Sequence, residues 1–575
     1  MESSTHLKLN LSLTGTSSSI LAVPVALPYD KPLEGPITDY ALLTFGSVVN
    51  AEYPVRSMML PAEGYQIEET SGRSTSHNKP WWFLYNIKTH HGVGVALAYS
   101  GNWKFEIKPR GQQVSIHLDT LPAGLSAFEE IGGIPIPGAL TSEFTGGWDY
   151  GAQPIVRYIR TKLLRDLGPD WPWVQYNTWY GTQDLGLTEE IILAAIPKAA
   201  AVGCELFTVD AGWYGINKRT SFHDTLGDWK VNPERLPRGL KVISDAVHQA
   251  GMKFGLWFEI ECASKDSEVA KDHPGWFIHD ASDHKRYRMI FDLTQPEVLN
   301  YLKDKLDVCI TDFSLDYIKM DLNTPLTFEG EKNSRGNDLA YDHVKGLLSI
   351  WRHLREKHPQ LAIENCAGGS HRQDVTQAGF TDTHWVSDNV DNHANLMMNY
   401  SYSYLFPPEM CSHWTVKPDA NDPFMDIETQ FTVNMLGHFG ISGAIWEWDE
   451  TTTGILTERI ALYKKIRPLI RRADVYHLTE QVKVGGSIQA VLYVDSVNQQ
   501  AIIFAFQAGA PSLATTLKLP GLQPDTTYRI IFPVHFGGSQ VSTGQELLDK
   551  GMALTFPTPG SSAIIQIQSE GNCNL

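Results

Sequence analysis

Two short apolar segments of the sequence each end close to a carboxylate. Residues 316–323 read Asp-Tyr-Ile-Lys-Met-Asp-Leu-Asn, and residues 384–389 read His-Trp-Val-Ser-Asp-Asn. If both segments are strands of one parallel sheet, Asp321 and Asp388 lie at the same edge of that sheet. Two carboxyl groups on either side of a bound sugar are what cleavage of a glycosidic bond requires. The spacing therefore favours glycoside hydrolysis.

A lysine two residues before the first acid suggests how the two acids divide the work. Lys319 and Asp321 share one face of a strand, because side chains alternate with a period of two. A buried ammonium keeps a carboxylate ionised, which suits a nucleophile or an electrostatic stabiliser. Asp388 would then donate the proton, with a pKa raised by the neighbouring anion. The structural alternatives are an ion pair for the first two residues and a helix N-cap for Asp388.

The middle of the chain alternates apolar strands with stretches of helical period. In residues 236–251, Leu240, Ile243 and Val247 recur at spacings of three and four, and Gly251 stands where the helix should end. Eight such units predict a central (β/α)8 TIM barrel rather than a doubly wound sheet, which would carry a glycine-rich first turn. The predicted strands are 173–179, 204–211, 253–260, 316–322, 361–366, 383–388 and 442–448, with one more between 395 and 415.

Acidic and aromatic residues gather where these predicted strands end. The carboxyl ends of barrel strands form the active site, so residues there are candidates for function. A single acid at such a place is commonly a helix cap, but many acids together with aromatic rings favour catalysis or sugar binding. The candidates are Trp179, Asp210, Trp257, Glu259, Glu261, Lys319, Asp321, Cys366, Asp388, Asp391, Trp446, Glu447 and Asp449.

The two ends of the chain have a different pattern, in which short runs alternate apolar and polar residues between Gly, Pro and Ser. This period of two predicts antiparallel β structure. We therefore expect a multidomain α/β protein. Residues 1–165 form an N-terminal antiparallel β-sandwich domain, residues 166–475 the catalytic barrel, and residues 476–575 a C-terminal antiparallel β domain of the sandwich type.

Composition excludes several classes of function. The chain has 575 residues and a net charge of -18, and no basic run that could follow a phosphate backbone, so nucleic acid is not an expected partner. No apolar stretch is long enough to span a membrane, and no signal peptide is recognised, which predicts a cytoplasmic protein. Six dispersed cysteines, without a Cys-x-x-Cys pair, argue against structural zinc and a disulfide framework.

No cofactor or metal is expected either. The sequence contains no dinucleotide fingerprint and no P-loop. His90 and His91 have no third ligand in view, and residues 388–392 lack the glycine and distant glutamate of a calcium loop. The expected partner is a small carbohydrate, and the β domains could also mediate a homo-oligomer.

Several stretches resemble the text of one enzyme family. Residues 207–215 read Phe-Thr-Val-Asp-Ala-Gly-Trp-Tyr-Gly, residues 226–229 Leu-Gly-Asp-Trp, and residues 251–259 Gly-Met-Lys-Phe-Gly-Leu-Trp-Phe-Glu. From about 171 to 449 the chain resembles glycoside hydrolase family 36, the melibiase or α-galactosidase family, whose clan also holds family 27. The resemblance implies that Asp321 is the nucleophile and Asp388 the general acid/base of a retaining double displacement.

The same resemblance implies which other side chains contact the sugar, and it implies an aromatic lid from the N-terminal domain, at Trp81 or Trp82. Arg286 is placed by counting back from Asp292, a looser anchor than the strand motifs. The implied sugar contacts are Trp179, Asp210, Trp257, Arg286, Lys319, Asn323 and Cys366.

Three departures from the family pattern bear on substrate recognition. Ala211 stands where the family has the second of two aspartates, Ser370 and His371 interrupt a glycine run, and Tyr180 follows Trp179 where relatives tend to carry an acid. A hydrogen bond to a charged group contributes about 1.5–3 kcal/mol, so the missing carboxylate weakens discrimination between sugars.

The expected function is that of a retaining exo-α-glycosidase acting on terminal α-linked galactose or a close relative. One alternative keeps the mechanism and changes the sugar to N-acetylgalactosamine, glucose or a pentopyranose, and another is a transglycosylase. A further alternative, from a different class, is a catalytically silent, lectin-like protein with the same pocket.

Overall fold

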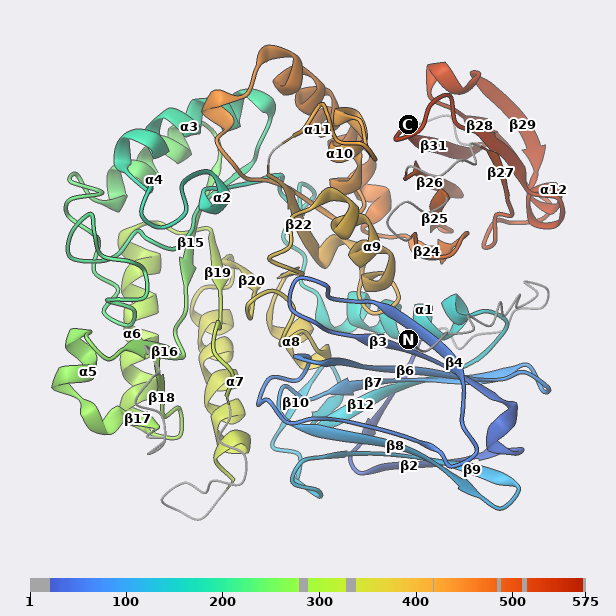
Figure 1. The fold of residues 1–575 in the computed structure, drawn as a ribbon, viewed down its shortest axis with the longest axis horizontal. Helices are drawn as coiled ribbons and strands as arrows, with labels where there is room; N and C mark the ends of the chain where they lie inside the picture. Colours follow the sequence, from blue (N-terminus) through green and yellow to red (C-terminus); the bar gives the residue numbers. More distant parts are fainter. Residues whose placement is uncertain are drawn as a thin grey trace.

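Along the chain, a closed parallel barrel lies between two regions of antiparallel sheet, and in space both regions lie on the same side of the barrel (Figure 1). The computed structural model describes residues 21–278, 288–326, 338–416, 418–482, 488–508 and 514–571. Arg286 lies outside these residues, so its predicted sugar contact stays a prediction.

The barrel has eight parallel strands in chain order, and it closes where Gln175 pairs with Gly440 and Tyr176 with Ile441. This architecture confirms the predicted fold class, and six of the expected strand segments each enclose a barrel strand. The strands are β13 (Gln175–Asn177), β14 (Leu206–Val209), β15 (Lys253–Phe258), β19 (Tyr317–Met320), β20 (Ala362–Asn365), β21 (Thr383–Trp385), β22 (Cys411–Thr415) and β23 (His438–Ile441).

A helix follows each barrel strand, and local signals set where these helices begin and end. The Thr188 side chain accepts a hydrogen bond from Ile191 N at the start of α3, and Gly251, with φ of +80°, ends α4 as predicted. The helices around the barrel are α3 (Glu189–Val202), α4 (Leu240–Gln249), α6 (Pro296–Asp312), α7 (Leu339–Lys357), α8 (Val375–Phe380), α9 (Asn392–Tyr402), α10 (Ile427–Asn434) and α11 (Glu450–Ile470). Two short helices, α2 (Trp179–Thr182) and α5 (Glu268–Asp272), and a small sheet of β16 (Cys262–Ser264), β17 (Phe277–Ile278) and β18 (Arg288–Phe291) lie in the loops.

The predicted last strand at 442–448 is wrong. Strand β23 ends at Ile441, and residues 445–447 form a 3-10 turn. Gly443 has a φ of +95°, and a Cβ there would lie 2.0 Å from Val416 O, so the backbone turns out of the sheet at a point where only glycine fits. The apolar run alone did not reveal this turn. The uncertain segment 395–415 is mostly helix α9, with β22 at its end.

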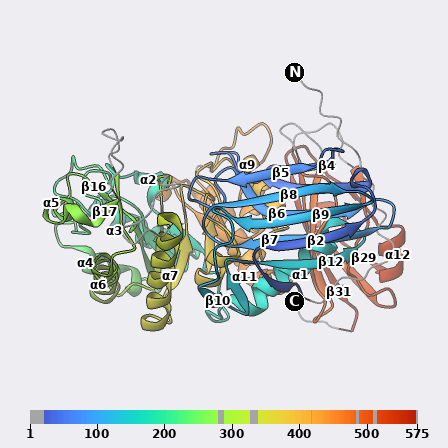
Figure 2. The ribbon, with the colours of Figure 1, turned by 90° about the horizontal axis from the view of Figure 1, so that it is seen from below.

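The N-terminal region consists of a six-stranded sheet (β1-β12-β7-β6-β3-β4) and a four-stranded sheet (β2-β9-β8-β5), which overlie each other in Figure 2. The rings of Trp82 and Phe105 stack between them at 3.9 Å. The strands are β1 (Val23–Ala26), β2 (Tyr29–Glu34), β3 (Tyr40–Gly46), β4 (Val55–Met59), β5 (Tyr65–Glu69), β6 (Asn78–Asn86), β7 (His91–Ala98), β8 (Trp103–Arg110), β9 (Gln113–Thr120) and β12 (Gly138–Thr145), beside the hairpin β10 (Glu129–Ile131) and β11 (Ile134–Ile136).

The predicted aromatic lid is wrong, because Trp81 and Trp82 are both fully buried. Trp82 faces the inside of the sandwich. Trp81 faces the barrel, where its ring lies 4.9 Å from that of Phe406. Strand β6 is covered on both faces, so neither indole reaches solvent or the site.

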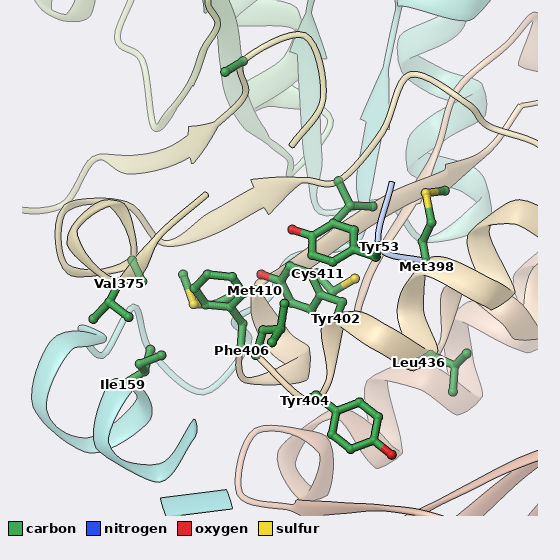
Figure 3. Close-up of a cluster of buried hydrophobic side chains, with 14 of the residues drawn as sticks. Tyr53, Ile159, Val375, Met398, Tyr402, Tyr404, Phe406, Met410, Cys411 and Leu436 are labelled. Atoms are coloured by element: carbon green, nitrogen blue, oxygen red, sulfur yellow. The ribbon is translucent and has the colours of Figure 1, made fainter. Parts of the chain in front are cut away.

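Side chains of the N-terminal domain interlock with those of the barrel. Figure 3 shows Tyr53 among barrel residues, and its ring centroid lies 5.6 Å from that of Tyr402. Phe45 contacts Tyr404 in the same way, at 5.8 Å. Helix α1 (Trp148–Tyr158) then carries the chain from the last N-terminal strand toward the barrel.

The C-terminal region is a six-stranded antiparallel sheet with a two-stranded sheet beside it. Its elements are β24 (Asp474–His477), β25 (Ile488–Asp495), β26 (Gln500–Gln507), β27 (Ala514–Leu517), β28 (Thr527–Ile531), β29 (Ser539–Thr543), α12 (Gly544–Asp549), β30 (Met552–Thr555) and β31 (Ser562–Ser569). Among the residues that the structure describes, no helix combines the length and the apolar character needed to cross a bilayer.

Candidate active site

A pocket opens at the carboxyl ends of the barrel strands and contains most of the residues predicted from the sequence. The space within it is about 390 Å³, which includes open solvent at its mouth. The lining is acidic and aromatic. It consists of Trp179, Tyr180, Asp210, Ala211, Phe222, Trp257, Lys319, Asp321, Asn323, Trp385, Asp388 and Trp414.

Asp321, just after β19, is a buried carboxylate held by donors on several sides. Its Oδ1 accepts hydrogen bonds from Gly368 N at 3.0 Å and Leu322 N at 2.8 Å. Its Oδ2 accepts from Asn323 Nδ2 at 2.7 Å and from Trp257 Nε1 at 3.2 Å. These contacts fix the carboxylate in one orientation.

The surroundings keep Asp321 ionised. Burial alone would raise the pKa of Asp321, but the Lys319 ammonium and the hydrogen bonds from Gly368 and Asn323 lower it below the ordinary value. An ionised carboxylate with a fixed orientation has the properties of a nucleophile.

Asp388 has the opposite character. It follows β21, its Oδ1 accepts a hydrogen bond from Trp385 Nε1 at 2.9 Å, and it reaches solvent at the pocket. The protein walls around it displace water, and this desolvation, together with the negative charge of Asp321, raises the pKa of Asp388. A carboxyl group that holds its proton toward higher pH is suited to general acid catalysis.

Lys319 forms its direct ion pair with Asp210, not with Asp321. Its Nζ lies 3.0 Å from Asp210 Oδ2, and that oxygen also accepts from Asn177 Nδ2 at 2.7 Å. The ammonium lies over two indole rings, 4.7 Å from the centroid of Trp414 and 5.1 Å from that of Trp385. The buried Lys319 ammonium therefore acts on two acids. It forms an ion pair with Asp210, and its charge lowers the pKa of Asp321 without direct contact.

Cys366, a predicted sugar contact, does not line the pocket. Its thiol is buried against Asp321 and packs in a cluster with Trp385 and Trp414. The other predicted contacts with described positions, Trp179, Asp210, Trp257, Lys319 and Asn323, all line the pocket.

Two further acids at strand ends lie outside the pocket lining and support it. Glu259 accepts hydrogen bonds from the backbone and side-chain nitrogens of Asn323, at 2.8 and 3.1 Å, and pairs with Arg288 at 3.1 Å. Glu261 is paired with Arg372 and with His343.

The remaining strand-end candidates do not line the pocket. Asp391 caps α9 by accepting from Ala394 N, and Asp449 caps α11 by accepting from Thr452 N. Trp446 and Glu447 belong to the 3-10 turn after β23.

The sequence analysis missed three aromatic residues of the lining, Phe222, Trp385 and Trp414. Phe222 comes from the long irregular loop after β14, where no periodicity marks it, and its ring packs edge-on against Trp179 and Trp257. Trp385 and Trp414 are the pair of indoles beneath Lys319, with ring centroids 3.8 Å apart and planes tilted by 31°. Their position inside predicted strands was the available signal.

Within the described part of the chain, no three His, Cys, Asp or Glu side chains are arranged to hold a metal ion. The carboxyl groups of Asp321 and Asp388 are held by hydrogen bonds from protein donors.

Two family profiles match the chain. The profile described as Melibiase matches residues 143–473, and the profile described as Glycosyl hydrolase family 36 C-terminal domain matches residues 488–567. The first covers more than half of the chain, including every barrel strand.

Curated relatives show the same similarity. The alpha-galactosidase Mel36A of Lactobacillus acidophilus is 30% identical over 503 residues, which are 84% of this chain and 66% of the relative. The alpha-galactosidase AgaA of Geobacillus stearothermophilus is 27% identical over 511 residues, 86% of this chain and 69% of the relative. The chain thus spans about two thirds of the length of these relatives.

Solved structures share the fold. An alpha-galactosidase structure from Lactobacillus brevis superposes with a TM-score of 0.83 at 24% identity, covering 95% of this chain and 75% of that one. The Geobacillus enzyme AgaA gives 0.82 at 24% identity, covering 94% and 76%. A variant of AgaA has been solved in complex with raffinose and gives 0.81 at 23% identity, with the same coverage.

We predict that Lys319→Met destabilises the fold. It leaves Asp210 buried without its cation, and an uncompensated buried charge costs about 3–5 kcal/mol. Urea unfolding at neutral pH measures the loss. The matched control is the double variant Lys319→Met, Asp210→Asn, which removes both charges and should regain much of the free energy of unfolding. A double variant as unstable as the single one would contradict the ion pair.

Proposed function

The chain belongs to the melibiase family, glycoside hydrolase family 36, and from this membership we propose that it is a retaining α-galactosidase that removes terminal α-linked galactose. Family membership makes it a glycoside hydrolase. The retaining mechanism and the sugar are the proposed parts.

Two displacements at the anomeric carbon make up the proposed reaction. Asp388 gives its proton to the glycosidic oxygen while Asp321 attacks the anomeric carbon, so the bond to the leaving group breaks as a galactosyl ester forms on Asp321. Asp388, now ionised, takes a proton from water. As it loses this proton, the water attacks the anomeric carbon and releases Asp321. The configuration inverts twice and is therefore retained.

The observation that carries this proposal is the opposite tuning of two carboxyl groups in one pocket. The pKa of Asp321 lies below and that of Asp388 above the ordinary value, and the causes are separate: a cation and donors for the first, desolvation and an anion for the second. Two acids with only a structural role would not require pKa values shifted in opposite directions.

The relatives support galactose as the sugar, and the complex of the Geobacillus enzyme supports an oligosaccharide such as raffinose as the natural type of substrate. The polar side of the pocket, with Asp210 and Lys319, offers partners for sugar hydroxyls. Beside it, Ala211 and Phe222 present a methyl group and an aromatic ring. The pocket thus has fewer charged contacts on this side than two aspartates would provide.

We predict that p-nitrophenyl α-galactoside is the preferred member of a panel of aryl α-glycosides. Its kcat/KM should exceed those of the α-glucoside and the α-N-acetylgalactosaminide by about 10- to 100-fold, because one wrongly placed hydroxyl or an added group costs roughly 1–3 kcal/mol in a shaped pocket. A different leading sugar would overturn the choice of galactose. The absence of turnover on every member would indicate a binding protein.

Replacement of each acid should give a different azide product. In Asp321→Gly, azide can enter the space of the nucleophile and attack an activated α-galactoside once, which yields β-galactosyl azide. In Asp388→Ala, azide attacks the ester on Asp321 and yields α-galactosyl azide. Proton NMR of the products distinguishes the two anomers. Exchanged products would reverse the assigned roles, and full activity of Asp321→Gly would remove that residue from the mechanism.

The dependence of kcat/KM on pH should be bell-shaped. Activity rises as Asp321 ionises, at a pH below the ordinary aspartate pKa of about 3.9, and falls as Asp388 loses its proton, at a pH above it. The pair titrates as a unit, so both limbs are read as macroscopic values. In Asp388→Ala, assayed with a dinitrophenyl galactoside that needs no protonation, the alkaline limb should disappear. Its persistence would assign that limb to another group.

A further inference from the structure

The N-terminal domain places a buried carboxylate next to the loop that carries Asp388. Glu52 is only 3% exposed, and its Oε2 accepts a hydrogen bond from Ser387 Oγ at 2.5 Å. Ser387 precedes Asp388 in the sequence, so an acid 335 residues upstream contacts the neighbour of the acid/base residue.

The residue on the other side of Asp388 is held by the same segment. Asn389 N donates to Ser387 Oγ at 3.0 Å, and Asn389 Nδ2 donates to the backbone oxygen of Asn50 at 2.8 Å. Residues 50–52 thus contact both neighbours of Asp388. The hydroxyl of Ser387 links them, because it donates to Glu52 and accepts from Asn389.

A second route leads from the next residue of this segment to the Asp388 carboxyl group. The hydroxyl of Tyr53 donates to the side chain of Gln373, whose Nε2 donates to Trp385 O at 2.7 Å. Trp385 Nε1 in turn donates to Asp388 Oδ1. Figure 3 shows how deeply the Tyr53 ring is set among barrel side chains.

The loop that holds the nucleophile is anchored close by. Lys79 of strand β6 is fully buried and donates to Ser370 O at 2.7 Å and to Ser370 Oγ at 2.5 Å. A Cβ on Gly369 would lie 3.1 Å from both Glu52 Oε1 and Ser387 Cα. Gly368, the residue before Gly369, donates its N–H to Asp321. The Glu52 side chain therefore lies next to two segments, the loop that donates to Asp321 and the loop that carries Asp388.

The backbone of the segment is strained. Asn50 and Tyr53 both have a φ of 63°, and for a bulky residue such as tyrosine this left-handed conformation is unusual and unfavourable. Burial of the Glu52 and Lys79 charges is a second cost, since an apolar contact of the same size would stabilise the interface at least as well. A contribution to folding stability therefore does not account for the left-handed Tyr53 backbone or for the buried Glu52 and Lys79 side chains.

We propose that Glu52 is a positioning residue for the acid/base step: through Ser387 it holds the loop of Asp388 in the orientation that delivers a proton to the leaving group. This inference rests on the proposed function. A carboxylate makes a stronger acceptor than a neutral group and so limits the movement of the Ser387 hydroxyl and of the backbone that follows it. The N-terminal domain is then part of the catalytic apparatus.

The test is the dependence of activity on the leaving group. In Glu52→Ala, kcat/KM should fall by about 10- to 100-fold for melibiose, whose sugar leaving group needs full protonation, because general acid catalysis contributes about 10²- to 10⁴-fold. For 2,4-dinitrophenyl α-galactoside, which leaves without protonation, it should fall by less than about 3-fold.

Three further variants make the result specific. Glu52→Gln keeps an acceptor of the same shape and should recover most of the activity on melibiose. Ser387→Ala removes the link and should show the same leaving-group dependence, and it carries the test if Glu52→Ala does not fold. Ser74→Ala is the control. It removes a hydroxyl of the same domain interface, which donates to Asp374 Oδ2 at 2.5 Å, and it should change kcat/KM for both substrates by the same factor.

An equal loss on both substrates in Glu52→Ala and Ser387→Ala would mean that Glu52 acts only on the fold, and it would overturn the inference. An inactive wild-type protein would instead overturn the proposed function, and the inference with it. The two failures are distinguishable, because the first occurs only when the wild-type protein hydrolyses α-galactosides.

Discussion

One buried ammonium group is the condition on which the active site depends. The barrel brings Asp210, Asp321 and Asp388 to one end of its sheet, and three carboxylates in a pocket with little water would repel one another and take up protons. Lys319 contacts Asp210 directly and lowers the pKa of Asp321 through its charge. The balance is incomplete, because a single cation cannot offset three anions. Burial raises the pKa of Asp388, and the residual negative charge raises it further, so desolvation and a shortage of positive charge together create the proton donor.

The register of the barrel strands determines which side chains surround the Lys319 ammonium. Trp257 is the partner of Lys319 across β15 and β19, and its indole donates to Asp321, two residues farther along. Trp385, on β21, lies under the ammonium with its ring and donates to Asp388 with its nitrogen. The side chains that surround the cation thus also orient the two acids. A shift of one residue in either strand would turn its side chains to the opposite face, and the Lys319 ammonium would no longer lie beside the two acids.

The sequence predicted the parts of the site that depend on strand periodicity. The alternation of Lys319 and Asp321, and the position of Asp388 after a short apolar run, follow from the geometry of one strand each. Phe222 could not be predicted in the same way, because it reaches the pocket from an irregular loop whose course is set by tertiary contacts. The strand expected at 442–448 failed because the φ of Gly443 turns the chain, and the lid at Trp81 or Trp82 failed because burial on the second face of β6 comes from the barrel. Local patterns report one face of an element, and these errors arose where a distant segment covers the other.

The N-terminal domain belongs to the site although none of its described residues lines the pocket. The acid/base loop follows β21 directly, and Asp388 must reach solvent. A loop in that position keeps a fixed orientation only if something packs behind it. The segment 50–53 supplies this support, at the cost of a strained backbone at Tyr53 and a buried Glu52 side chain. Costs of this kind persist where a protein holds a reacting group in place, because the free energy lost from folding is recovered as orientation at the transition state.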